Sequence, residues 1–287
     1  MSVIKPIALT ETSQRLKMRD DDFQRIAKFA KSEAGLLFTQ QKAPMMESRL
    51  IKRLKVLGLN SFEEYCTLIE TSGDTNEKTE LISALTTNVT SFFREPHHFK
   101  ILMEQVIPEL KKRLELGEPV RIWSAGCSRG HEPYSIAMQL YDAIPNLAIY
   151  DLKILATDID PKVLLFARQG VYDTTELANL PDGYKEKFFS KTLSGAQINT
   201  EIRQLIKFNP LNLLKDWPMK NQFDLIFCRN VVIYFDQDTQ DSLWPKFQNA
   251  NRKEGWLFIG HSERLTNAVA PDYRSAGMTA YQKQSSK

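Results

Sequence analysis

The stretch VRIWSAGCSRGHEPYS, residues 120–135, decides the fold expected for this chain. Val120, Ile122 and Trp123 indicate a buried strand, and Pro133 begins an amphipathic helix. The turn between them is built mainly from small residues, which let a backbone approach a nucleoside cofactor without Cβ clashes. We therefore expect an α/β sheet that binds a ligand at the carboxyl ends of its strands. Taken alone, the turn also fits a plain strand-to-helix connection.

Two acids narrow the choice of ligand. LKILATDID, residues 152–160, predicts a second strand, and Asp158 at its end is placed to hold ribose hydroxyls. The spacing Gly126-x-x-x-Gly130 differs from the G-x-G-x-x-G of dinucleotide sites, and Glu132 would repel a pyrophosphate. The sequence has no phosphate-binding G-x-x-x-x-G-K-[ST] loop. The pattern favours an adenosine cofactor with a cationic centre and no phosphates, such as S-adenosylmethionine.

Composition indicates a soluble globular protein. The chain has 287 residues, of which 42% are hydrophobic and 25% charged, with a net charge of +3. That mild charge gives no reason to expect nucleic acid binding. Cys66, Cys127 and Cys228 are widely spaced, which suits a reducing cytoplasm and predicts no metal site. Apolar runs fall short of the ~20 residues of a membrane span, and residues 1–10 lack a signal-peptide core. We expect a cytoplasmic protein.

The chain is expected to contain two domains. Residues 1–90 show helical periodicity without strand-like alternation, which predicts an all-α domain. Residues 91–119 predict a linker helix, with Pro96 in its first turn and Gly117 just past its end. From 120 to 287 strands and helices alternate, as in a parallel sheet covered by helices. A β-subdomain is expected at about 185–209; the alternative is a surface loop plus one strand of the main sheet.

Five separated segments, in order and together, resemble one family, the CheR-type chemoreceptor glutamate methyltransferases. They are TTNVTSFFREPHHF (86–99), WSAGCSRGHEPYSIAM (123–138), ATDID (156–160), FCRNVVIYFD (227–236) and IGHSE (259–263). With the helical N-terminal region, the resemblance covers almost the whole chain. It implies a class I S-adenosylmethionine-dependent methyltransferase fold, Rossmann-like with a mostly parallel sheet, preceded by an all-α domain and carrying a small inserted β-subdomain.

The resemblance also implies the site residues. Arg94 and Tyr234 would be catalytic, placing the substrate carboxylate. His131 and Arg129 depart from the family pattern beside the key positions. The residues implied to bind S-adenosylmethionine, and its product S-adenosylhomocysteine, are Asn88, Thr90, Arg94, Glu132, Asp158, Asn212, Leu213, Arg229, Asn230 and Val231.

The implied reaction is methyl transfer to glutamate side chains of chemoreceptors, which forms γ-glutamyl methyl esters for sensory adaptation. A glutamate with a pKa near ~4.3 is already ionised at neutral pH, so no general base is needed. Arg49, Lys52 and Arg53 lie at helical spacing and are expected to share one exposed face, which would dock the receptor; the alternative is a solvated helix face. The partner would be the cytoplasmic methylation region of transmembrane chemoreceptors, without nucleic acid or membrane insertion, and the enzyme a monomer.

Two other functions stay open. One is a methyltransferase acting on a small molecule or RNA. The other is a catalytically silent module that senses S-adenosylmethionine and docks to receptors; intact Arg94, Glu132, Asp158, Asn230 and Tyr234 argue against it. The segment between Phe189 and Asn209 is short for a full peptide-docking subdomain, so we expect no recognition of a receptor tethering peptide.

Overall fold

The computed structural model describes residues 16–71, 73, 75–193 and 195–285. The predicted absence of a signal-peptide core concerns residues 1–10, which lie outside the described residues. The chain divides into two units. The first comprises the residues up to Phe29 together with Phe38–Leu85, and the second comprises Ala30–Leu37 together with Thr86–Lys287. Within the described ranges, every helix is too short or too polar to span a bilayer.

The first unit is helical, as its periodicity predicts. Its core is formed by buried side chains such as Ile26, Leu50 and Tyr65. Helix α2 ends at Gly58, whose φ of 67° is the left-handed conformation that glycine adopts readily. The elements are α1 (Asp20–Ala34), η1 (Gln40–Lys42), α2 (Ala43–Leu57), α3 (Phe62–Thr71) and α4 (Thr75–Leu85), with the end of α1 belonging to the second unit.

The predicted linker helix is present but irregular. It runs as α5 (Pro96–Ile101), a π-helical segment η2 (Leu102–Val106) and α6 (Ile107–Glu115). Pro108 has no N–H to donate to the Glu104 carbonyl, so the regular i to i−4 pattern cannot continue there. Gly117 lies just past the helix with a φ of 78°, as expected of a helix terminus.

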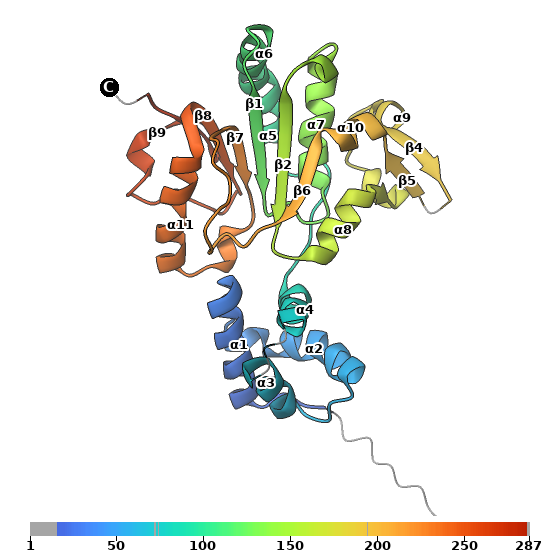
Figure 1. The fold of residues 1–287 in the computed structure, drawn as a ribbon, viewed down its shortest axis with the longest axis vertical. Helices are drawn as coiled ribbons and strands as arrows, with labels where there is room; N and C mark the ends of the chain where they lie inside the picture. The colour runs from blue at the N-terminus through green and yellow to red at the C-terminus, as the bar shows by residue number, and fades with distance from the viewer. Residues whose placement is uncertain (1–15, 72, 74, 194, 286–287) are drawn as a thin grey trace, which may run out of the picture. The chain divides into compact units, whose positions relative to one another are not determined.

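A seven-stranded sheet forms the centre of the second unit (Figure 1). β1, β2, β6, β7 and β8 are parallel, and β10 runs antiparallel to both of its neighbours. β10 thus lies between β8 and β9. In spatial order the strands are β6 (Ile206–Pro210), β2 (Leu152–Asp158), β1 (Val120–Ala125), β7 (Phe223–Cys228), β8 (Asn251–Ile259), β10 (Ala280–Lys283) and β9 (Tyr273–Gly277).

Both faces of this sheet are covered. Val120 and Ile122 of β1 pack in one hydrophobic core with side chains of α5, α6, α7 (His131–Ala143) and α8 (Pro161–Gln169). Trp123 and Ala125, which point the other way, pack in a second core with α11 (Gln237–Ala250). Short 3₁₀ helices complete the layers: η3 (Leu147–Ile149), η5 (Val232–Tyr234) and η6 (Ala270–Asp272).

A small antiparallel sheet is present, but its bounds differ from the prediction. Its order is β3 (Val171–Tyr172), β5 (Gly195–Ile198) and β4 (Phe189–Thr192), so it recruits a strand well before residue 185. Residues 206–209, expected at its end, instead lie in edge strand β6 of the main sheet, where the alternative prediction had one main-sheet strand. Gly195 is required because an added Cβ would lie 2.2 Å from the Tyr172 carbonyl oxygen. The accompanying helices are η4 (Thr174–Leu177), α9 (Tyr184–Phe188) and α10 (Thr200–Gln204).

The strand order creates one place suited to a ligand. From β1 the chain adds β2 and β6 on one side, and then crosses to add β7 and β8 on the other. Loops leaving β1 and β7 therefore diverge, and open α/β sheets bind ligands at such a switch point. The turn at Gly126, the acid Asp158 and residues 229–231 all follow strands at this edge.

Candidate functional site

The turn after β1 leaves no space for side chains at its first glycine. Gly126 has a φ of 78°, and a Cβ there would lie 2.3 Å from Cγ2 of Val231. Gly126 N and Cys127 N both donate to the Thr157 carbonyl, at 2.8 and 2.9 Å. Ser128 also has a positive φ, 48°, which is uncommon outside glycine and clusters at functional sites. The turn is thus tied to the end of β2 and held in an unusual conformation.

Asp158, the last residue of β2, lies directly against this turn. Its Oδ2 accepts a hydrogen bond from Ser128 N (2.8 Å) and its Oδ1 from Asp160 N (3.0 Å). Burial raises the pKa of Asp158 to about 6, against the opposing effect of these backbone donors. Each carboxylate oxygen keeps acceptor capacity, which is what a ribose ligand requires.

Glu132, in the first turn of α7, is not an isolated acid. Ser124 Oγ donates to its Oε1 at 2.7 Å, and Arg229 Nη1 lies 3.2 Å from its Oε2. Burial raises the pKa of Glu132, and the guanidinium of Arg229 opposes that shift. Its charge is therefore largely balanced inside the protein, by a residue 97 positions away in sequence.

Arg229 follows β7 and joins three segments. Its guanidinium lies 3.3 Å from Glu95 Oε2 and 3.2 Å from Glu132 Oε2, and it donates to the Arg94 carbonyl. The residue is 5% exposed, so most of its surface contacts protein. Arg229 thereby fixes the linker segment and α7 to the end of β7.

Sequence reasoning missed Glu263, which holds the loop after Arg229. Its carboxylate accepts hydrogen bonds from the backbone N–H groups of Gly260, Asn230 (3.1 Å), Val231 (2.9 Å) and Val232 (2.9 Å). Asn230 has a φ of 59°, a left-handed conformation that costs energy in a non-glycine residue. Glu263 lies in the segment IGHSE, so an acid shortly after the last parallel strand was the available signal.

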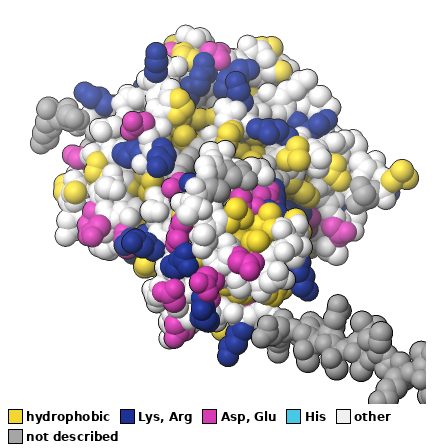
Figure 2. All heavy atoms as spheres, turned by 60° about the horizontal axis from the view of Figure 1, so that its bottom comes forward, with side chains coloured by type: hydrophobic (Ala, Val, Ile, Leu, Met, Phe, Trp, Pro, Cys, Tyr) yellow, Lys and Arg dark blue, Asp and Glu magenta, His cyan; other side chains and the backbone are white. Residues whose placement is uncertain are grey.

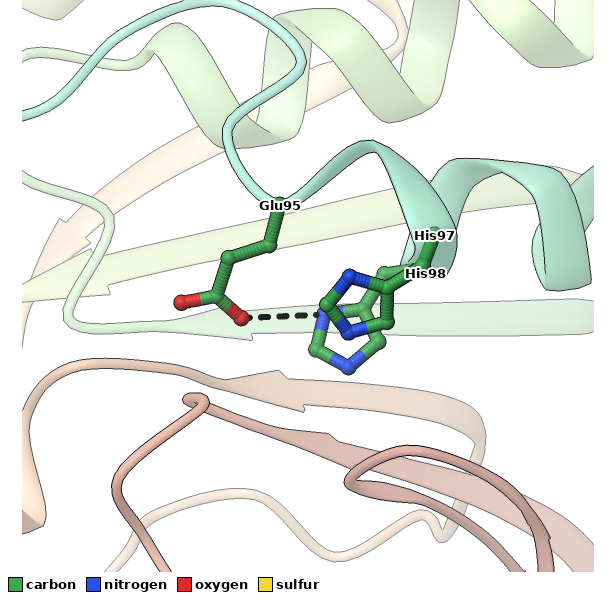
Figure 3. A group of neighbouring side chains, drawn as sticks. All are labelled: Glu95, His97 and His98. Carbon is green, nitrogen blue, oxygen red and sulfur yellow. Dashed lines mark ion pairs between the residues drawn. The ribbon is translucent and has the colours of Figure 1, made fainter.

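Glu95 is a second residue that sequence reasoning missed, and it forms a cluster with His97 and His98 (Figure 3). His98 Nε2 lies 3.1 Å from the Met278 carbonyl and 2.9 Å from Thr279 Oγ1. His98 Nδ1 faces Glu95 Oε2 at 3.4 Å. Burial lowers the pKa of His98 to about 3, with Arg229 contributing.

Ligand atoms of these three residues lie within 4.8 Å of one another, as in a metal site. However, Arg229 lies 3.3 Å from the same Glu95 oxygen and would repel a metal cation. The contacts therefore favour an ion-paired anchor for the linker segment over a metal site.

The two residues predicted to be catalytic lie on segments that Arg229 connects. Arg94 is half-buried, and its Nη1 donates to the Val89 carbonyl at 2.9 Å. Among the described residues, no carboxylate pairs with it. Tyr234 is half-buried in η5, and its carbonyl accepts from Leu37 N at 2.9 Å. Hydrogen bonds thus restrain the side chain of Arg94 and the backbone of Tyr234.

Contacts connect two of the other predicted cofactor segments to the end of β2 and the turn after β1. Asn88 Nδ2 donates to Asp160 Oδ2 (3.1 Å), and its carbonyl accepts from Ser128 Oγ (3.2 Å). Leu211 N donates to the Asp158 carbonyl at 2.9 Å, which brings residues 211–213 to the same edge. Asn212 and Leu213 follow, the latter 7% exposed, and Thr90 is half-buried. The Asn212 amide is engaged, donating to the Glu33 carbonyl and accepting from Leu214 N.

The departures at His131 and Arg129 have a structural role. The His131 ring is buried 4.6 Å from Phe92 and 4.7 Å from Tyr172, and burial lowers its pKa to about 3. Arg129 packs 3.9 Å from the Phe166 ring and pairs with Glu176 at 2.8 Å. Both side chains are therefore engaged in packing within the domain.

The predicted docking residues do not share one exposed face. Arg53 pairs with Glu77, itself 2% exposed, and with Glu80 at 2.9 Å, and its side chain is only 18% exposed. Arg49 donates to the Leu85 carbonyl at 2.8 Å, whereas Lys52 is exposed. The expectation of uniform exposure is wrong because helical spacing does not reveal acids on the neighbouring helix α4. The face drawn in Figure 2 likewise carries basic and acidic side chains together.

These residues fit an adenosine cofactor without phosphates. A side chain at position 126 would fill the space beside the turn, and Asp158 offers acceptors for hydroxyl groups. Arg229, the cation beside Glu132, is already paired with Glu132 and Glu95, so it is not available to a phosphate. Cys127 offers no nucleophile, because burial raises the pKa of its thiol well above the usual value.

Two family models match this chain. "CheR methyltransferase, all-alpha domain" matches residues 21–86, and "CheR methyltransferase, SAM binding domain" matches residues 88–281. The "Probable chemotaxis protein methyltransferase" of Rhizobium etli is 45% identical over 254 residues, covering 87% of this chain and 95% of the relative. The "Chemotaxis protein methyltransferase" of Salmonella typhimurium is 38% identical, with 95% and 93% covered. The "Chemotaxis protein methyltransferase 2" of Pseudomonas aeruginosa is 40% identical, with 94% and 95% covered.

Proposed function

Because this chain belongs to the CheR methyltransferase family, we propose that it methylates glutamate side chains of chemoreceptors, forming γ-glutamyl methyl esters. The observation that carries this proposal is the family match over both units, combined with the position of the implied residues. Asp158, Glu132, Asn212 and residues 229–231 all lie near the carboxyl ends of the parallel strands, within the residues 88–281 that match the S-adenosylmethionine-binding domain.

The proposed mechanism relies on positioning. S-adenosylmethionine, when bound, supplies a methyl group on a sulfonium centre, and S-adenosylhomocysteine is the expected product. Asp158 would accept hydrogen bonds from the ribose hydroxyls, and the turn at Gly126 would let the backbone approach the ligand. The substrate glutamate is already ionised, so the protein needs to align it and exclude water. Such alignment can lower a barrier by roughly 7–11 kcal/mol.

Arg94 and Tyr234 are the residues we propose to orient the substrate carboxylate. Arg94 keeps its charge available, since no acid pairs with it in the described part of the chain, while its bond to the Val89 carbonyl limits its motion. A full ion pair between Arg94 and the substrate carboxylate would make that carboxylate a weaker nucleophile. Because one edge of the Arg94 guanidinium already donates to the Val89 carbonyl, its contact with the substrate would be looser than a full ion pair. Tyr234 would contribute its hydroxyl from η5.

Receptor docking through α2 is also part of the proposal. Reversing the charge of Arg53 would leave Glu77 buried without its cation and damage the fold. Lys52 and Lys55 are exposed on the same helix and allow the docking face to be tested without that damage.

A methyl-transfer assay distinguishes the candidate functions. Purified protein is incubated with tritiated S-adenosylmethionine and receptor-rich membranes, and methanol released by alkali is counted. Base-labile label in receptors supports the proposal. Label in RNA or small molecules would indicate a different methyltransferase, and S-adenosylhomocysteine binding without transfer would indicate a silent module.

A further inference from the structure

A hollow of about 400 Å³ lies among α8, α10 and β6, and three basic side chains line it. Arg168 comes from the last turn of α8, Arg203 from α10 and Lys207 from β6. Asn209 adds an amide, and Tyr134 and Phe208 contribute aromatic carbon. We call this the basic hollow; its lining includes no acid and none of the residues assigned to S-adenosylmethionine.

Both arginines are held in place by neutral groups. Arg168 Nη2 donates to the Phe208 carbonyl at 2.7 Å. Arg203 Nε donates to the Ile198 carbonyl at 3.0 Å, and its Nη2 donates to Thr200 Oγ1 at 3.2 Å. The Arg203 stem also packs closely on Gly170, where a Cβ would lie 3.1 Å from Cδ. These contacts orient the guanidinium groups without neutralising them, and each keeps further N–H donors.

Several other arginines of this protein, by contrast, have acidic partners. Arg53, Arg121, Arg129 and Arg229 each pair with a carboxylate. In the ranges that the structure describes, neither Arg168, Arg203 nor Lys207 forms an ion pair. Three like charges around one hollow repel one another, and a bound anion would remove that repulsion.

We propose that the basic hollow binds the phosphate group of a small molecule. Oriented guanidinium forks match the geometry of phosphate oxygens, and the lysine and amide supply further donors. The volume falls at the lower end of the ~300–1,000 Å³ typical of small-molecule sites. Tyr134 and Phe208 are 0% and 6% exposed, so they offer little surface for stacking a nucleobase. Recognition should therefore depend on the phosphate rather than on the group attached to it.

Calorimetric titration of the full chain with pyrophosphate at low salt tests this proposal. We compare the wild type with Arg168→Gln/Arg203→Gln and with a control, Lys191→Gln/Lys253→Gln, which removes two exposed charges elsewhere. The wild type and the control should bind with similar affinity, and the arginine variant at least tenfold more weakly. S-adenosylhomocysteine affinity should be unchanged in all three proteins.

Titrations with ADP and with succinate test whether the hollow recognises a phosphate group or any anion. ADP should bind about as tightly as pyrophosphate, and succinate at least tenfold more weakly. If the double variant fails to fold, Lys207→Gln replaces it and should weaken pyrophosphate binding several-fold. The proposal is overturned if the wild type shows no saturable binding, if the arginine or Lys207 variant binds as tightly as the control, or if succinate matches pyrophosphate.

Discussion

Replacing Glu263 by glutamine tests the most informative contact in the site. The carboxylate accepts four backbone N–H bonds, with Val231 and Val232 on Oε1, and Asn230 and Gly260 on Oε2. A glutamine amide keeps one oxygen and places an NH₂ against the other pair of donors. Two charge-assisted bonds, worth ~1.5–3 kcal/mol each, are lost, partly offset because the buried charge is also removed.

We expect a net local cost of about 2–4 kcal/mol, borne by the loop that carries Asn230. Asn230 has a left-handed φ of 59°, a conformation that costs roughly 1–3 kcal/mol. Once the four hydrogen bonds to residue 263 weaken, the loop would relax to a conformation without this cost. If ligand binding must supply 1.4–2.8 kcal/mol to return the loop to its wild-type conformation, the affinity for S-adenosylhomocysteine falls about 10–100-fold. Methyl transfer should fall at least as much, because Tyr234 follows the same loop.

The assays are calorimetry with S-adenosylhomocysteine and initial rates with receptor-rich membranes. Glu186→Gln, at an exposed position, is the matched control and should behave as wild type. Glu263→Asp keeps the charge on a shorter side chain and should recover part of the affinity. If Glu263→Gln binds and turns over within twofold of wild type, the loop does not depend on Glu263 and the reasoning is wrong.

Three further predictions concern other residues. Because burial raises the pKa of Asp158 from 3.8 to about 6, its contribution to stability is fully present below pH ~4 and lost as pH rises through about 6. In unfolding experiments without ligand, the stability of Asp158→Asn relative to wild type should thus rise between pH 4 and pH 7, by at most ~3 kcal/mol; calorimetry should show weaker S-adenosylhomocysteine binding to the variant, and unchanged affinity would refute the ribose assignment. Tyr234→Phe should lower methyl transfer more than cofactor affinity, and full activity would exclude the hydroxyl from positioning. Lys52→Glu/Lys55→Glu should lower receptor kcat/KM about tenfold at low salt, with a flatter salt dependence and unchanged cofactor affinity, whereas wild-type rates would show that these lysines are only solvated surface.

Local pattern was sufficient to predict the elements that carry the cofactor site. The strand before Gly126 and the acid Asp158 at the end of the next strand were both predicted from periodicity and turn residues. Each depends on interactions within a few residues, which sequence pattern reports directly. The family resemblance added the remaining site residues.

Contacts between segments that are far apart in the sequence produce no periodic pattern in it. The pairs Glu132–Arg229 and Asn230–Glu263 join residues 97 and 33 positions apart, so their partners become visible only in the folded chain. Arg53 was expected to be exposed for the same reason, since its acids lie on another helix. The short strand β3 was missed because two residues are too few to show the alternation of buried and exposed side chains that indicates a strand.

The position of β10 has a consequence for synthesis of the protein on the ribosome. β9 (Tyr273–Gly277) pairs only with β10 in the described sheet, and β10 (Ala280–Lys283) is the piece that joins it to β8. As the nascent chain emerges, β9 must wait unpaired until residues 280–283 have been translated and inserted beside β8. A chain shortened before residue 280 would expose the edge of β8, and such unpaired edges favour association with other chains. Completion of the sheet therefore requires residues 280–283, which follow strands β1, β2 and β7 in the sequence.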